Sequence, residues 1–237
     1  MDITPCDTSD IITVYDIADS DNENTCSSDC NKNYHNYNAL NIKPTLWGNI
    51  FWNFLHDIAK YCINASCEII GEIKNMVSTL PYILPCSSCR NHCLTIYNNQ
   101  SDATSLNVIS DFKTWLWHLK SLINKNTGSP NICFNDYNQR LYLLSHFCSA
   151  KQLFDLLFMI AYSYPHKCES DNYRQKYYRI FFNSVAFFCS KIKHLNKFAL
   201  INKYNSDWNT YSDLLNHISY NYYAVYNSHY EYHKFNI

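Results

Sequence analysis

Only three of the 237 residues are glycine, and this scarcity constrains the fold more than any other feature. Rossmann folds, P-loops and proteins rich in β-hairpins need glycine at tight turns, so the composition argues against all three. Apolar residues instead recur every three or four positions, which is the spacing of helices with one buried face. No stretch alternates between apolar and polar residues as a half-buried strand would. We therefore predict an all-α protein.

The pattern divides the chain into three parts. Residues 1–31 hold eight acidic side chains and no Lys or Arg, so we expect residues 1–43 to be a flexible acidic leader. Residues 44–134 form one expected domain, with helices over 44–62 and 69–80, a short helix starting near residue 87, and a helix over 105–126 that Gly128 and Pro130 end. Residues 135–237 form a second helical domain, with helices predicted over 141–161, 173–198 and 208–223.

Charge and hydropathy narrow the possible functions. The 206 residues after the first 31 carry 19 basic and 12 acidic side chains, but the basic residues are scattered, so we expect no nucleic-acid surface. We expect no secretory signal, because the first residues have neither a basic start nor an apolar run, and no apolar stretch is long enough to span a bilayer. In an unsecreted chain, twelve cysteines favour metal binding or redox chemistry over structural disulfides.

The sharpest chemical signal is Pro85-Cys86-Ser87-Ser88-Cys89-Arg90. A Cys-x-x-Cys pair at a helix start places Cys86 near unsatisfied backbone N–H groups, which lower a thiol pKa, and Arg90 adds positive charge. Two intervening residues also permit a small disulfide that is easily reduced and reformed. The alternative is half of a zinc site, but His92 and Cys93 lie too close to complete it and no second Cys-x-x-Cys exists. The spacing favours a redox pair, and we predict no metal ligands.

Several motifs occur in a fixed order around this pair. They are Gly48-x-x-x-Trp52-x-x-Leu55-His56-x-x-Ala59-x-Tyr61, then Pro85-Cys86-x-x-Cys89, then Phe112-x-x-Trp115-Leu116 followed by Asn124, Gly128 and Pro130. This arrangement resembles the Erv/ALR family of flavin-linked sulfhydryl oxidases over residues 44–134. The length, the leader and the extra C-terminal half are similar to viral members, such as those of baculoviruses and giant viruses.

The resemblance implies a bundle of four or five helices that holds FAD against the redox disulfide. Cys86 would be attacked by incoming protein thiols, and Cys89 would be the sulfur next to the flavin. The reduced flavin would then pass two electrons to O₂ and give H₂O₂. The FAD contacts it implies are Gly48, Trp52, His56, Tyr61 and Cys89, with Trp117, His118, Lys120, Asn124 and Lys125 from the fourth helix. Such an enzyme would act on thiol-containing proteins in the host cytoplasm, nucleus or virion.

Some residues depart from the family pattern. Lys120-Ser121 replaces the family's His-Asn, which removes an adenine-stacking imidazole that Trp117 or His118 would have to replace. Trp117 also occupies the position of a structural cysteine, so the family's stabilising disulfide is absent or rewired, for example as Cys93–Cys133. These departures leave open an inactive relative that has lost FAD. A second alternative is a helical structural module in which Cys86, Cys89, Cys93 and another ligand hold zinc.

Two further features extend the hypothesis. Cys26 and Cys30 in the leader could shuttle electrons to the core or be incidental. A faint repeat aligns residues 55–59 with 157–161 and Cys86 with Cys189, and it predicts that residues 135–237 are a degenerate second copy that packs as an internal pseudo-dimer partner, with homodimerisation as the alternative. This copy would be catalytically silent, because Phe158 stands in place of His56 and Ile192 in place of Cys89.

Overall fold

The computed structural model describes residues 42–61, 66–99, 112–143, 147–164, 172–195 and 211–226. Apart from one short 3₁₀ turn over 193–195, the regular structure in these ranges is α-helical, which confirms the predicted all-α class. The helices are α3 (Pro44–Tyr61), α4 (Cys67–Ser78), α5 (Leu80–Ile83), α6 (Ser87–Asn99), α7 (Phe112–Thr127), α8 (Phe134–Leu143), α9 (Ala150–Tyr162), α10 (Asn172–Lys191) and α11 (Tyr211–Tyr226). The predicted leader with Cys26 and Cys30, and the expected helical residues 105–111, lie outside the described residues.

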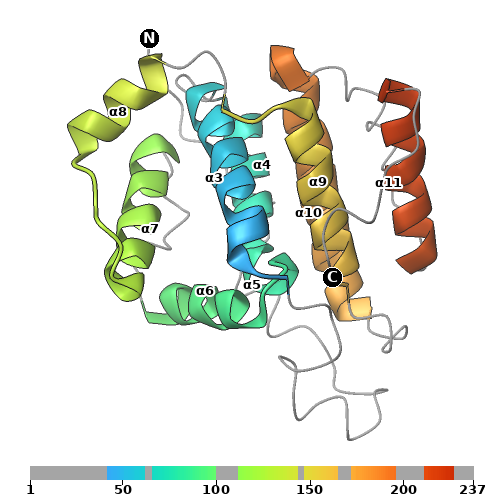
Figure 1. Cartoon of the computed structure of the whole chain (residues 1–237), viewed down its shortest axis with the longest axis horizontal. Coiled ribbons are helices and arrows are strands. Elements are labelled where there is room, and N and C mark those ends of the chain that lie inside the picture. Colours follow the sequence, from blue (N-terminus) through green and yellow to red (C-terminus); the bar gives the residue numbers. More distant parts are fainter. Residues whose placement is uncertain are drawn as a thin grey trace, which may run out of the picture.

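Helix α3 lies at the centre of the molecule, between α7 and α8 on one side and α9 on the other (Figure 1). Its apolar residues recur at helical spacing, so Trp47, Phe51, Phe54, Leu55 and Ile58 share a buried face. Apolar burial of this kind supplies most of the stability of a helix that is packed on several sides.

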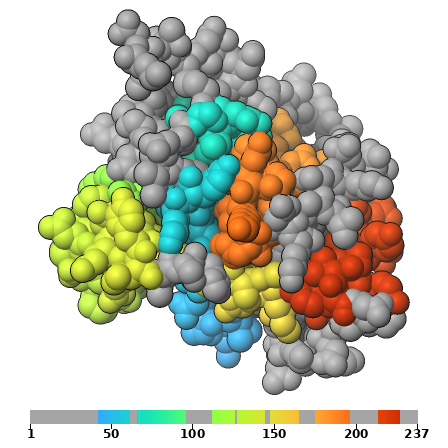
Figure 2. Space-filling model, turned by 90° about the horizontal axis from the view of Figure 1, so that it is seen from above, coloured from blue at the N-terminus to red at the C-terminus, as the bar shows by residue number. Residues whose placement is uncertain are grey.

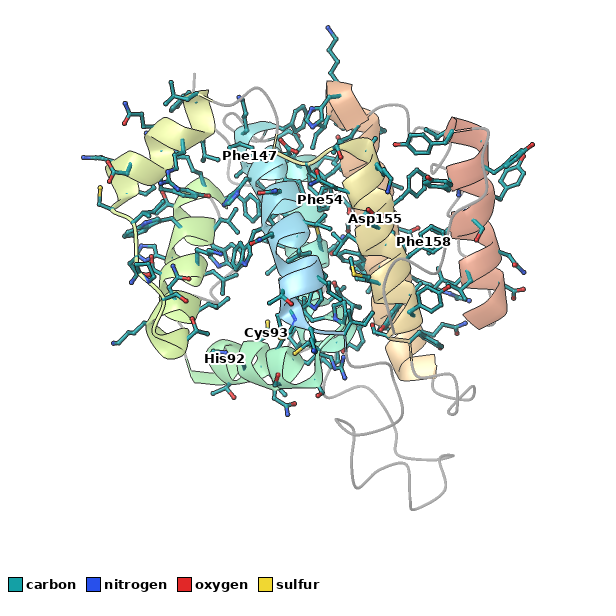
Figure 3. The ribbon with its side chains drawn as sticks, viewed as in Figure 1. Phe54, His92, Cys93, Phe147, Asp155 and Phe158 are labelled. Carbon is teal, nitrogen blue, oxygen red and sulfur yellow. The ribbon has the colours of Figure 1, made fainter. Side chains whose placement is uncertain are left out.

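The C-terminal helices extend the same core. Helix α9 packs on α3, α10 packs on α4 and α5, and α11 covers α9. Viewed from above, α7 and α8 lie at one end of the molecule and α11 at the other (Figure 2). Phe54 lies between α3 and α9, and Phe158 lies between α9 and α11 (Figure 3), both fully buried. The predicted boundary at residue 134 coincides with the start of α8, and the division into two domains stays a prediction.

The helix predicted over 141–161 is wrong in one respect, because the structure has two helices there. Helix α9 begins after Ser149, whose Oγ accepts a hydrogen bond from the N–H of Gln152 at 3.2 Å while the Gln152 side chain accepts from the N–H of Ser149 at 2.9 Å. This reciprocal capping box starts a new helix rather than continuing α8.

Two other helix ends follow simple backbone chemistry. Pro81 lies in the first turn of the short helix α5, where a missing N–H leaves no hydrogen bond unmade. Gly128 ends α7 as predicted, with a φ of 69° that favours glycine. Among the helices that the structure describes, none combines the length and hydropathy needed to cross a membrane.

Candidate functional site

Cys86 and Cys89 lie at the first turn of α6. The backbone N–H of Cys89 donates a hydrogen bond to Cys86 Sγ at 3.3 Å, so the sulfur caps the helix, and Ser88 Oγ lies 3.0 Å from the same sulfur. The Cys89 N–H, at the positive end of the helix dipole, is placed to stabilise an anion on Cys86 Sγ. In the Ser88 contact either the hydroxyl or the thiol can be the donor. The structure thus places the pair as the Cys-x-x-Cys spacing predicted.

The backbone around the pair is held in place by hydrogen bonds. Arg90 is 4% exposed, and its guanidinium donates to the carbonyl of Leu84. The N–H of Arg90 donates to Cys86 O at 3.0 Å, and the N–H of Ile42 donates to Pro85 O at 2.9 Å. Arg90 supplies two of these donors and Ile42 supplies the third, so the three carbonyls before α6 are all hydrogen-bonded.

Burial sets the protonation of the second sulfur. Removal from water, followed by interaction with Cys86, raises the pKa of Cys89 to about 12, while Ser88 and Arg90 act in the opposite direction. In the reduced pair, Cys89 therefore keeps its proton at neutral pH. Cys86 is buried at 3% exposure whereas Cys89 is partly exposed. If substrate thiols attack Cys86, that sulfur is expected to be the more exposed of the two, and the structure shows the opposite.

The zinc hypothesis receives no support from the positions of these thiols. Cys93 lies one turn beyond Cys89 on α6, next to His92 (Figure 3). Within the described ranges, no group of three or more His, Cys, Asp or Glu side chains is placed to hold a metal ion. Cys93 and Cys133 are both free thiols, so the suggested bridge between them is not formed in this structure.

A second cluster of side chains lies where α3 faces α7 and α8. We call it the aromatic site: Trp52 and His56 from α3, Lys120 from α7, Tyr137 from α8, and Phe147 from the turn before α9. Lys120 Nζ lies 4.3 Å from the ring centroid of Trp52. The rings of Tyr137 and Phe147 lie 5.5 Å and 5.3 Å from that of His56. The structure thus brings together three predicted FAD-binding residues, Trp52, His56 and Lys120.

Burial of the aromatic site shifts the pKa of its two ionisable side chains, and one of its buried nitrogens lacks a hydrogen bond. Burial, and then the charge of Lys120, lowers the pKa of His56 to about 4, so its imidazole is neutral at physiological pH. His56 Nε2 is buried and has no hydrogen-bond partner among the described residues. Burial also lowers the pKa of Lys120. Buried polar atoms are usually paired, and exceptions of this kind concentrate at binding sites.

These residues fit the FAD that the sequence resemblance implies. Aromatic rings offer stacking surfaces to a flavin or an adenine, and the unpaired nitrogen of His56 offers a hydrogen bond. Lys120 offers positive charge to a diphosphate, although it stands where the family has an imidazole. The side chains of the aromatic site therefore match the chemistry of a flat, anionic dinucleotide.

The other predicted contacts from α7 are engaged elsewhere or exposed. Trp117 donates from Nε1 to the carbonyl of Ile132 at 3.0 Å and packs edge-on against Phe134. His118 and Lys125 are exposed. Asn124 donates its amide to the carbonyl of Pro130 at 2.9 Å, which closes the turn after α7. Their roles in FAD binding stay predictions.

Two predicted positions on α3 remain to be placed. Tyr61 is the last residue of α3 and is 39% exposed. A Cβ at Gly48 would meet no described atom within 4 Å, so its surroundings are open. Three residues near the site were missed by sequence reasoning: Tyr137, Phe147 and Asp57. None of them is a defined position of a motif. Asp57 directly follows His56 in the sequence, whereas only the fold brings Tyr137 and Phe147 to the His56 ring.

The family match covers the helices that carry this site. The Erv1/Alr family model matches residues 49–142, which run from α3 to α8. A protein of Invertebrate iridescent virus 6, described as a candidate FAD-linked sulfhydryl oxidase (347L), is 30% identical over 95 residues, covering 38% of this chain and 86% of the relative. The chain belongs to the Erv1/Alr family. The predicted resemblance is confirmed, and with it the expectation of an FAD-linked thiol oxidase at the level of the family.

Other comparisons set the limits of this family assignment. A candidate FAD-linked sulfhydryl oxidase of Invertebrate iridescent virus 3 (096R) is 37% identical over 54 residues, covering 22% of this chain and 36% of that protein. No solved structure matches this Erv1/Alr chain. The family match ends at residue 142, so α9, α10 and α11 lie outside it.

Proposed function

We propose that this Erv1/Alr protein is an FAD-linked sulfhydryl oxidase that oxidises protein dithiols through Cys86 and Cys89. The observation that carries the proposal is the position of this pair at the first turn of α6, where Cys86 Sγ accepts the N–H of Cys89 at 3.3 Å. The pair also lies within the matched residues 49–142. The relatives named as candidate FAD-linked sulfhydryl oxidases support the same activity.

The proposed chemistry begins with thiol–disulfide exchange at the oxidised pair. A substrate thiolate attacks Cys86 Sγ, the Cys86–Cys89 bond breaks, and Cys89 leaves with the electron pair. A second substrate thiolate then attacks the mixed disulfide at the substrate sulfur and releases Cys86, so the substrate becomes a disulfide and the pair gains two electrons and two protons. The N–H of Cys89 donates to Cys86 Sγ, the sulfur that leaves in this second exchange. The raised pKa of Cys89 means that its thiolate takes up a proton after it has left in the first exchange.

The aromatic site would hold the cofactor during the second half of the cycle. Trp52 would provide a stacking face, Lys120 a positive charge and His56 a neutral hydrogen-bonding nitrogen. When bound, FAD accepts two electrons and two protons from the reduced pair and passes them to O₂, which leaves as H₂O₂. Regeneration of the Cys86–Cys89 disulfide completes the cycle.

The proposal includes where the enzyme acts and whether it forms a dimer. The relatives named above are proteins of iridescent viruses, which supports a viral enzyme. We propose that it acts on thiol-containing proteins in the host cytoplasm, nucleus or virion. Residues 55–59 and 157–161, the first part of the faint repeat, lie on α3 and α9, which pack directly on each other. That contact supports an internal pseudo-dimer, with homodimerisation as the alternative.

The proposal can be tested by the visible spectrum and oxygen uptake of the purified protein. We expect a yellow protein that bleaches when a dithiol is added, consumes oxygen and recovers its colour once the dithiol is exhausted. A colourless protein that cannot be loaded with FAD would overturn the proposal and would point to an inactive relative. Metal analysis of the same sample tests the zinc alternative directly.

A further inference from the structure

We propose that the chain beyond the family-matched region completes the FAD site, because Asp57 holds Phe147 against His56. Phe147 and the helix that follows it lie outside residues 49–142, so the matched region alone would lack this wall of the aromatic site. The inference rests on the proposed FAD-linked function and assigns a positioning role to Asp57.

Asp57 is a buried carboxylate at 3% exposure in an otherwise apolar part of α3. Its two oxygens accept the backbone N–H of Phe147 at 2.9 Å and the N–H of Cys148 at 2.7 Å. These donors precede Ser149, the N-cap of α9, where a negative charge also interacts favourably with the helix dipole. One side chain of α3 therefore fixes the turn that leads into α9.

The same carboxylate receives a third contact from far along the chain. His194 Nε2 lies 3.2 Å from Asp57 Oδ2, and His194 belongs to the short turn after α10. Two separate segments beyond residue 142 thus converge on Asp57. Because a buried carboxylate is costly unless it is fully hydrogen-bonded, these contacts act as a unit, and loss of one weakens the placement of the others.

The contact with the aromatic site follows from the neighbouring residue. His56 directly precedes Asp57 on α3, and the Phe147 ring lies 5.3 Å from the His56 ring at an angle of 55°. Phe147 lies at the upper end of α3, beside the start of α9 (Figure 3). The backbone of Phe147 is held by Asp57 while its ring covers His56. Any shift of the Asp57 contacts would therefore move the ring away from the imidazole.

The test is the dissociation constant of FAD for the full-length apoprotein, measured by quenching of flavin fluorescence. Asp57→Asn replaces one acceptor oxygen by an amide donor, and Phe147→Ala removes the ring. We expect each to weaken FAD binding by about 3- to 10-fold, which is the loss typical of an aromatic packing contact. Both substitutions remove the same contact. We therefore expect the FAD dissociation constant of the double variant to be no higher than that of the single variant with the larger effect.

Matched controls separate positioning from general destabilisation. Glu72→Gln changes another carboxylate that joins the two parts of the chain, since Ser184 Oγ donates to Glu72 Oε2 at 2.8 Å between α4 and α10. Phe187→Ala removes a partly buried ring on α10. Both should lower the melting temperature without changing FAD affinity by more than about twofold, because neither contacts the aromatic site.

The outcomes are distinct for the two proposals. Wild-type affinity in both Asp57→Asn and Phe147→Ala would overturn this inference and leave the proposed function intact. Equal weakening in the two controls would also overturn it, because the effect would then follow stability alone. A wild-type protein that binds no FAD would overturn the proposed function and this inference with it. If Asp57→Asn does not fold, Phe147→Ala and Phe147→Leu decide the question alone.

Discussion

Two faces of α3 differ in how well their polar groups are satisfied. On the face toward α9, Asp57 has three hydrogen-bonding contacts and lies among fully buried apolar residues such as Phe54. On the face toward α7 and α8, the adjacent His56 has a buried nitrogen without a partner in the described part of the chain, beside Lys120 and the partly exposed Trp52. The face of α3 toward α9 therefore contributes to the packed core, whereas the face toward α7 and α8 has polar groups that a ligand can bind.

The comparison also separates the family-matched helices from those that follow. The cysteine pair and most of the aromatic site lie within residues 49–142, whereas α9 to α11 contribute mainly buried side chains. A fold can keep unpaired polar groups at a site only if other contacts provide the stability, and the packing of α9 and α10 on α3, α4 and α5 provides such contacts.

The largest effect is expected at the redox pair. Cys86→Ser and Cys89→Ser should each lower oxidase turnover by at least about 1000-fold, because disulfide exchange needs both sulfurs. Oxygen uptake with a dithiol measures this loss. Given a substrate that already carries a disulfide, the free Cys86 thiolate of Cys89→Ser should attack it, release one substrate thiolate and remain as a mixed disulfide, because no Cys89 thiol is present to resolve it. Cys133→Ser alters an exposed free thiol and should keep wild-type turnover. Wild-type activity in Cys89→Ser would remove the pair from the mechanism.

The next effect tests the packed face of α3. Phe54 is fully buried, so Phe54→Ala should lower the free energy of unfolding by about 3–5 kcal/mol, as expected for a large cavity. Denaturant unfolding of the apoprotein measures the change. Trp52→Ala on the other face should lower stability less and FAD affinity more. Equal losses of stability and of FAD affinity in Phe54→Ala and Trp52→Ala would contradict the difference between the two faces of α3.

A smaller effect concerns pH and His56. Its pKa is lowered from 6.5 to about 4 in the folded protein, so the unfolded chain binds a proton more readily between these values. The free energy of unfolding should therefore fall as pH drops through this window, by about 2 kcal/mol between pH 7 and pH 5 from this group. In His56→Gln this part of the pH dependence should disappear, as unfolding curves at the two pH values would reveal. An unchanged pH dependence would mean that His56 is not a buried neutral imidazole.

The smallest effect is expected at Lys120. Lys120→Met removes the positive charge next to Trp52 and should weaken FAD binding by about tenfold, which corresponds to one charge-assisted contact. Lys120→Arg should retain most of the affinity, and the wild type should lose more affinity with added salt than Lys120→Met does. Lys151→Met removes an exposed charge on α9 and serves as the control. Equal salt dependence in wild type and Lys120→Met would exclude the charge interaction.

The sequence predicted the parts of the molecule that depend on local patterns. The apolar spacing in α3, the start of α6 at Ser87 and the Gly128 stop of α7 are local, and the structure confirms them. The break between α8 and α9 was missed although Ser149-x-x-Gln152 is a capping signature, because the apolar spacing continues across it. Phe147 and His194 could not be predicted as partners of Asp57, because they lie 90 and 137 residues away and carry no motif.

The most direct test of the central claim is an anaerobic dithiol titration of the FAD-loaded protein, followed by its visible absorbance. We predict that about two equivalents of dithiol reduce the protein fully, one for the Cys86–Cys89 disulfide and one for the flavin. The Cys86→Ser variant should keep its yellow colour under the same conditions. Bleaching of that variant at the wild-type rate would contradict the account, because electrons would then reach the flavin without the cysteine pair.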